Sequence, residues 1–101
     1  MKQFMNAREA LVTEALDGLI RASSGRLARL DGYPHIRVVV RTDWDRSKVA
    51  LVSGGGSGHE PSHAGFVGQG MLAAAVCGDV FASPSVDAVL AGILAVTGPS
   101  G

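Results

Sequence analysis

The sequence has few of the residues that mark specialised classes of protein. Its 101 residues include a single cysteine, Cys77, so no disulfide can form within the chain. Nine basic residues balance nine acidic ones, and the formal net charge at pH 7 is zero. Without a basic field, we expect no nucleic acid and no anionic membrane surface as a partner. The arginines, concentrated before position 47, are expected on solvated faces.

Long hydrophobic runs are also missing. No uninterrupted apolar stretch approaches the roughly 18 residues that suggest a transmembrane helix. Glu9, Glu14 and Asp17 lie near the N-terminus, where a secretory signal would carry no such acidic residues. Apolar residues still make up 47% of the chain, which is enough for a packed core. We therefore expect one cytoplasmic domain, or part of one, with Cys77 as a buried and inert thiol.

Helical periodicity is clearest at the two ends of the sequence. Apolar residues recur at helical spacing over about 7–22, and Ser23, Ser24 and Gly25 predict the end of that helix. A second helix is predicted with Ser83 as its cap and Pro84 at its first position. A short helix is expected to begin near Pro61. The expected apolar face of the second helix consists of Val86, Val89, Leu90, Ile93 and Leu94.

Three strands are predicted between these helices. Residues 36–41 are rich in β-branched side chains. Residues 49–55 form a more apolar strand, short enough to be buried on both faces, and a third strand is expected near 74–77. Residues 26–35 carry the turn signals Asp-Gly and Tyr-Pro and are interpreted as a turn. The order of elements indicates an α/β fold with a mixed sheet flanked by helices.

The stretch "LVSGGGSGHEP", residues 51–61, places three consecutive glycines directly after an apolar run. Glycine lets backbone N–H groups approach a ligand without a Cβ in the way. Ser57 adds a hydroxyl, and His59 adds a group that can accept a proton near neutral pH. The pattern fits a cradle for a small hydroxylated molecule. It also fits a tight turn with a histidine facing solvent, and the residues alone leave both interpretations open.

The segment "HEPSH" matches the zinc-binding pattern H-E-x-x-H in letters only. That pattern requires a helix, and Pro61 both lacks an N–H and disfavours the helical conformation at Glu60. We therefore expect no metal site. His63 is interpreted as a support that hydrogen-bonds the loop, and His35 as structural. The glycines also lack the Lys-Ser/Thr of a P-loop and the spacing of a dinucleotide fingerprint.

The run "KVALVSGGGSGHEPSHAGFVGQGMLAAAVCGDVFASPSVDAVLAGI" resembles the substrate-binding K domain of dihydroxyacetone kinases. The motifs "GGGSGHEP", "GFVGQGML" and "CGDVFASPS" follow one another without gaps. "RLARLDGYPHIRVVVR" is similar to the ATP-dependent, single-chain branch of that family. The resemblance covers nearly the whole chain. It implies that residues 1–101 are the N-terminal portion of a DhaK-type domain, with the nucleotide-binding L domain absent.

The resemblance also implies a site and a reaction. Members of the family phosphorylate dihydroxyacetone, glyceraldehyde or a related short ketose, with a role in glycerol metabolism. The segment that contacts the substrate matches Gly56, Ser57, Gly58 and His59, and His59 matches the group that accepts a proton from, or orients, the attacking hydroxyl. A second histidine of the family holds the substrate carbonyl covalently. Neither His35 nor His63 matches its position.

Cofactors and partners follow from the same resemblance. ATP and Mg²⁺ serve the full enzyme and bind outside this chain, on the L domain; a phosphotransferase-linked branch uses a separate L subunit. A homodimer is expected. The family sequence continues past Gly101 to a Lys, an Asp and the covalent histidine, so we expect the 101-residue polypeptide alone to be inactive. The alternative is a non-catalytic, dihydroxyacetone-binding paralogue that acts as a regulator.

Overall fold

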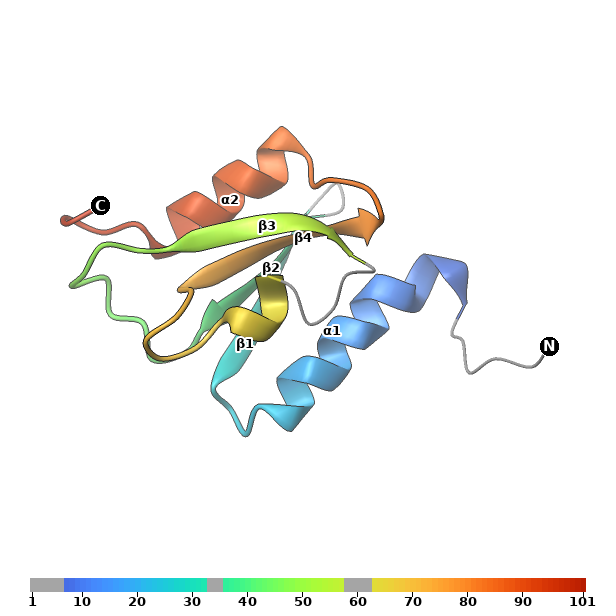
Figure 1. Cartoon of the computed structure of the whole chain (residues 1–101), viewed down its shortest axis with the longest axis horizontal. Helices are drawn as coiled ribbons and strands as arrows, with labels where there is room; N and C mark the ends of the chain where they lie inside the picture. The colour runs from blue at the N-terminus through green and yellow to red at the C-terminus, as the bar shows by residue number, and fades with distance from the viewer. Residues whose placement is uncertain (1–6, 33–35, 58–62) are drawn as a thin grey trace.

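The computed structural model places four strands in one mixed sheet between two helices (Figure 1). It describes residues 7–32, 36–57 and 63–101. The expected α/β fold with a mixed sheet flanked by helices is confirmed. The elements in chain order are η1 (Arg8–Ala10), α1 (Leu11–Ala22), β1 (Leu27–Gly32), β2 (Ile36–Arg41), β3 (Val52–Ser57), η2 (His63–Phe66), β4 (Ala74–Val80) and α2 (Val86–Val96).

The strand order is β1-β2-β4-β3, which puts the glycine-rich strand at an edge of the sheet. β1 pairs antiparallel with β2, and β2 antiparallel with β4. β3 pairs parallel with β4, so these two strands end at the same edge. The expectation that the second strand is buried on both faces is wrong. The strand runs from Val52 to Ser57 and is mostly only partly buried, and Val49 and Leu51, which precede it, are exposed.

The sheet has an apolar core on each face. One core lies under α1 and η2, and the other lies under α2, as the helices on opposite sides of the sheet show (Figure 1). Cys77 is 5% exposed within the first core, which confirms the expected burial of the thiol. The first core contains Val12, Leu16, Leu27, Val39, Ala64, Val67, Ala75 and Cys77. The second contains Val38, Ala73, Ala74, Val76, Ala88 and Val96.

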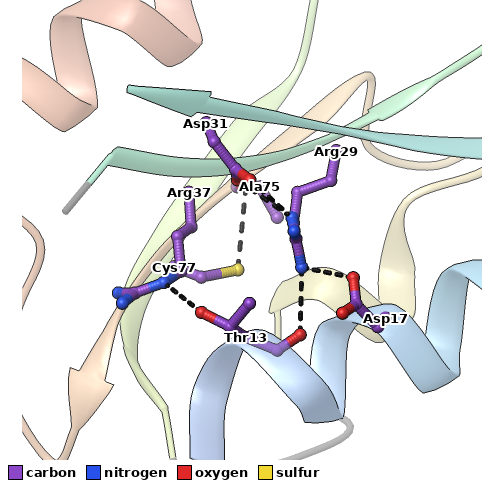
Figure 2. A network of polar contacts seen from close by, with 7 residues as sticks. All are labelled: Thr13, Asp17, Arg29, Asp31, Arg37, Ala75 and Cys77. Carbon is purple, nitrogen blue, oxygen red and sulfur yellow. Dashed lines mark hydrogen bonds and ion pairs between the residues drawn. The ribbon is translucent and has the colours of Figure 1, made fainter. Parts of the chain in front are cut away.

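Two arginines connect α1 to the sheet through polar contacts (Figure 2). Arg29 of β1 donates to the backbone oxygen of Thr13 at 3.0 Å and pairs with Asp17 of α1. Arg37 of β2 donates from Nε to Thr13 Oγ1 at 2.9 Å. The side chains of Arg29 and Arg37 are only 18% and 13% exposed, so the expectation of solvated arginines is wrong for these two. Their long stems cover apolar surface while their charges are paired.

Strand β1 was missed in the sequence, where residues 26–35 looked like a turn. The turn signals are real but mark only the end of the strand, because Leu27–Gly32 runs directly into them. Arg29 and Asp31 hid the strand's alternation, since a charged pair occupies positions where an apolar residue would be expected. The two bond to each other at 3.1 Å.

Helix α2 begins later than expected and buries a different face. Its cap is Ser85, whose Oγ accepts a hydrogen bond from the Ala88 N–H at 3.1 Å; the predicted cap, Ser83, and Pro84 precede it. The buried residues are Ala88, Gly92 and Val96. A Cβ on Gly92 would collide with the Val76 side chain, so small residues let the helix approach the sheet closely. The predicted apolar face is instead exposed, at Val86, Val89, Leu90, Ile93 and Leu94.

Within the part of the chain that the structure describes, neither helix has the length and hydrophobicity needed to cross a membrane.

Candidate functional site

The glycine-rich end of β3 lies beside the end of β4, at the edge where ligands bind in open α/β sheets. Gly55 pairs with Cys77, but Ser57 pairs with Val80, so β4 contains one extra residue across this interval. Such a β-bulge bends the strand and changes the direction of nearby groups, and bulges are frequent next to active sites. The three glycines, predicted as the start of a loop after a strand, belong to the last part of strand β3 itself, which ends at the carboxyl edge.

Ser57, the last residue of β3, is hydrogen-bonded to β4. It is 7% exposed, and its Oγ donates to the backbone oxygen of Gly78 at 2.9 Å. The Phe81 N–H donates to the backbone oxygen of Ser57 at 2.6 Å. The hydroxyl proton is therefore engaged within the protein. What Ser57 offers a ligand in this arrangement is a lone pair and its backbone, on a rigidly held segment.

Gly56 packs directly against the backbone that follows β4. A Cβ at this position would lie 2.9 Å from the nitrogen of Ala82 and 3.2 Å from its oxygen. Real Cβ atoms do not approach backbone atoms so closely without a shift, so only glycine fits here. The glycines of the motif thus have a packing role between β3 and the chain after β4, which the sequence alone did not distinguish from a role in ligand approach.

Two of the four predicted site residues, Gly56 and Ser57, are described. Gly58 and His59 lie outside the described residues, as do His35, Glu60 and Pro61. The expected short helix near Pro61 appears in the described chain only as the 3-10 turn η2, from His63 to Phe66.

His63 contacts the strand that leads into the site. Its Nδ1 lies 3.0 Å from Ser53 Oγ, a hydrogen bond whose direction depends on the tautomer of the ring. A Cβ on Gly55 would lie 2.5 Å from its Nε2. The interpretation of His63 as a hydrogen-bonding support of the loop agrees with this contact. Nothing in the sequence identified Ser53 as the partner, because it lay within an ordinary predicted strand, residues 49–55.

Open space borders β3 on both faces. A pocket of about 400 Å³ lies between β3 and α2, against Gly54, Gly55, Val89 and Ile93. A second pocket of about 290 Å³ lies on the η2 side and is lined mainly by apolar side chains together with Ser53 and His63. Both are large enough for a molecule of a few carbon atoms. The backbone of β3 therefore separates two hollows that a small ligand could enter.

Asp79, near the end of β4, takes part in an ion pair and in a turn. Its side chain is 61% exposed and lies 3.6 Å from Nη1 of Arg37, and its backbone oxygen accepts from the Ala82 N–H at 3.0 Å. The Asp79 backbone thus forms the turn after β4, and its carboxylate belongs to the arginine network that extends towards α1. It lines none of the pockets beside β3.

No cluster of three or more His, Cys, Asp or Glu side chains suited to a metal ion occurs among residues 7–32, 36–57 and 63–101. The described part of the site therefore offers backbone groups, a serine and a histidine that faces β3, with a charged pair, Arg37 and Asp79, beyond it. These groups can bind and orient a small polar molecule.

Comparison with known proteins gives a consistent family assignment. Residues 17–101 match the Dak1 domain. The dihydroxyacetone kinase of Citrobacter freundii is 63% identical over 99 residues, which is 97% of this chain. Crystal structures of that enzyme, native and in complex with AMP-PNP and Mg²⁺, cover 96% of the chain at 61% identity with a TM-score of 0.89.

A third similar structure is that of a dihydroxyacetone kinase operon co-activator, Dha-DhaQ. It covers 84% of the chain at 39% identity with a TM-score of 0.76. The chain spans 18% of the length of the Citrobacter freundii kinase and 25% of that of the co-activator. The similarity therefore concerns one segment of longer proteins.

Proposed function

The chain belongs to the Dak1 domain family, and from this premise we propose that it is the N-terminal portion of the substrate-binding domain of a kinase acting on dihydroxyacetone, glyceraldehyde or a related short ketose. The observation that carries the proposal is the glycine strand β3, fixed to β4 at the carboxyl edge of the sheet, in a chain 63% identical to a dihydroxyacetone kinase. The reaction transfers a phosphoryl group from ATP to a terminal hydroxyl of the triose.

In this proposal, the segment Gly56, Ser57, Gly58 and His59 binds the substrate. Backbone N–H groups, free of side chains at the glycines, donate to the oxygens of the triose. Ser57 keeps the segment in place through its bond to Gly78. His59 accepts the proton of the attacking hydroxyl, which acquires alkoxide character as the phosphoryl group arrives.

ATP and Mg²⁺ are assigned to a different part of the enzyme. The described residues contain no cluster of metal-binding side chains, so they do not fit the magnesium ions. In the proposed full protein an L-type domain holds the nucleotide, two such chains form a homodimer, and the whole acts in the cytoplasm. The crystal complex of the Citrobacter freundii enzyme with AMP-PNP and Mg²⁺ supports the choice of donor.

The experiment uses the complete polypeptide that the gene encodes, with dihydroxyacetone, ATP and Mg²⁺, and follows formation of the phosphate ester. We expect turnover with dihydroxyacetone and none with glycerol, which lacks a carbonyl. The 101-residue polypeptide, assayed in parallel, is expected to show none. His59→Ala in the complete protein is expected to lower kcat by roughly 10²–10⁴-fold, the usual contribution of a positioned base. Normal turnover in that variant would remove His59 from the mechanism.

A second candidate is a regulator that binds dihydroxyacetone without phosphorylating it. The similarity to the operon co-activator, with a TM-score of 0.76, favours this possibility. Calorimetry combined with the ester assay distinguishes the two: a regulator binds dihydroxyacetone in the complete protein but forms no ester with any donor. Ester formation at a rate well above background would exclude it.

A further inference from the structure

We infer that His63 is a positioning residue that holds the backbone of Gly56 and Ser57 in place for the substrate, an inference that rests on the proposed function. His63 is the first described residue after positions 58–62, and its ring returns to the strand before them. Nδ1 shares a 3.0 Å hydrogen bond with Oγ of Ser53, ten residues earlier. One side chain therefore connects the two flanks of the binding segment.

The ring also lies against Gly55. Residues two apart on a strand point to the same face, so Ser53 and Gly55 both present that face to η2. A Cβ on Gly55 would lie 2.5 Å from Nε2 and 3.2 Å from Cδ2 of the imidazole. The missing side chain at Gly55 thus makes room for the histidine. The ring spans two positions of β3, one through a hydrogen bond and one through close packing.

The backbone of His63 is held in an unusual conformation. Its φ is +59°, in the left-handed region that non-glycine residues seldom adopt, although histidine is found there more often than most. Such a conformation persists only where the surroundings impose it. The turn that follows provides this support, because Ala64 and Val67 are buried in the core under α1. The imidazole is therefore presented from a rigid base.

The other flank of the segment is fixed independently. Ser57 is bound to Gly78 through Oγ and to Phe81 through its carbonyl oxygen. Residues 53–57 are thus held at both ends: by His63 at Ser53 and Gly55, and by β4 at Ser57. Removing the imidazole should loosen the middle of this strand while the rest of the sheet stays intact.

Other roles for His63 fit the structure less well. A metal ligand needs partners, and the described residues contain no suitable cluster. A nucleophile–base pair with Ser53 needs a group that orients the second ring nitrogen, but Nε2 faces the backbone of Gly55. The adjoining pocket is lined chiefly by the apolar side chains of Phe66, Met71 and Leu72.

The test uses four single variants of the complete protein. His63→Gly removes the ring and relieves the backbone conformation. His63→Asn keeps a hydrogen-bonding atom where Nδ1 lies, and asparagine tolerates positive φ. Ser53→Ala removes the other partner without changing the backbone. The control, Thr42→Val, deletes a comparable side-chain bond, 2.7 Å from Oγ1 to the Gly25 oxygen, away from β3.

We expect His63→Gly and Ser53→Ala to lower kcat/KM for dihydroxyacetone by up to about 100-fold, since small misplacements at a reacting centre cost that much. KM for ATP should not change. His63→Asn should recover most of the loss, and the double variant Ser53→Ala/His63→Gly should be no worse than His63→Gly alone. Hydrogen exchange in the peptide covering residues 52–57 should accelerate in His63→Gly but not in Thr42→Val.

The inference is overturned if His63→Gly changes kcat/KM for dihydroxyacetone no more than Thr42→Val does, or if exchange in residues 52–57 stays unchanged. Failure of His63→Asn to recover activity would also contradict the role assigned to the Ser53 bond. A wild-type protein that neither binds nor phosphorylates dihydroxyacetone would overturn the proposed function first, and the positioning role with it. If His63→Gly then still accelerated exchange in residues 52–57, the contact between His63 and β3 would have only a structural role.

Discussion

β2 and β3 bond to opposite sides of β4, but they use side chains in opposite ways. β2 places Val38 in one core and Val39 in the other, and both are fully buried. β3 has glycine at three consecutive positions, 54–56, and is partly exposed through most of its length. β2 therefore contributes side chains to both cores, whereas β3 mainly exposes its backbone.

The glycines make β3 less stable than β2, and the side-chain hydrogen bonds of β3 offset this cost. Each buried valine contributes about 1.5–3 kcal/mol to folding. Each glycine within a strand loses roughly 0.5–1 kcal/mol relative to alanine. β3 compensates with side-chain tethers, at Ser53 and at Ser57, that hold it to η2 and β4. A strand without an apolar face can therefore keep a fixed shape, which a binding segment requires.

The largest effect is expected in β2. The double variant Val38→Ala/Val39→Ala should lower the free energy of unfolding by about 3–6 kcal/mol, because it empties space in both cores. Denaturant titration of the complete protein measures the loss. KM for dihydroxyacetone should stay the same in the molecules that remain folded. A large rise in KM would mean that β2, too, shapes the site.

Gly56→Ala should instead weaken ligand binding, with a smaller loss of stability than the β2 variant. Its Cβ would meet the Ala82 nitrogen at 2.9 Å, so the backbone on one side must move. We expect a loss of stability of about 1–3 kcal/mol, as for other overpacked sites. Affinity for dihydroxyacetone, measured by calorimetry, should fall at least about tenfold, since a small displacement of bound groups is costly. If binding is unchanged, the segment does not contact the ligand.

Ser57→Ala is expected to have a moderate effect on stability. It leaves the backbone oxygen of Gly78 without the hydroxyl that bonds it at 2.9 Å in a buried position. The loss should be about 1–3 kcal/mol, the cost of an unsatisfied buried acceptor. Thermal unfolding detects it, and Ser57→Cys serves as a control that restores a weak donor of similar size. Equal stability of the alanine variant would show that the tether contributes nothing.

The smallest effect concerns Asp43, just after β2. Hydrogen bonds from Arg41, one of them 2.8 Å long, hold the pKa of this carboxyl below its ordinary value. A carboxyl whose pKa is lowered in the folded state stabilises the fold at pH values above its ordinary pKa. This contribution disappears as the pH falls through the lowered pKa. Carboxyl-carbon NMR should show the low pKa, and Arg41→Gln should raise it. The Asp43 side chain is 59% exposed, so the stability curve should barely move.

Local patterns predicted those elements whose burial is simple. β2 occupies the predicted residues 36–41, because its β-branched side chains pack on both faces of the sheet. The first helix was also anticipated, as the 3-10 turn η1 followed by α1, and it ends at Ser23 with Ser24 and Gly25 at positive φ. In both segments the residue types that favour the element are also those that the core requires.

Tertiary contacts determine the elements that were predicted incorrectly from the sequence. β1 holds Arg29 because α1 supplies partners for it. α2 turns Ala88, Gly92 and Val96 to the sheet, and a Cβ at Gly92 would collide with Val76. Hydropathy favours the larger side chains and so indicated the wrong face. Nothing local distinguishes a helix that is held close to a sheet from one that packs through leucines.

The position of the candidate segment at the edge of the sheet was predictable from the sequence, but the contacts that support it were not. The glycines and Ser57 were assigned to a loop at a carboxyl edge; they lie at that edge, but within strand β3. The bond between Ser53 and His63 depends on how the chain returns after ten residues, and the bond from Ser57 to Gly78 crosses to another strand. Such pairings depend on the fold, so residue spacing alone does not reveal them.

The mixed pairing of the sheet also sets an order of assembly. β1 and β2 form a local hairpin, whereas β3 meets β4 only after the intervening chain has folded back. Closing longer loops costs more entropy and slows the pairing of distant strands. The β3–β4 pairing is therefore expected to form after the β1–β2 hairpin. Pulse-labelled exchange should show amides of the β1–β2 hairpin protected before those of Val52–Ser57, so the glycine-rich edge forms after the hairpin.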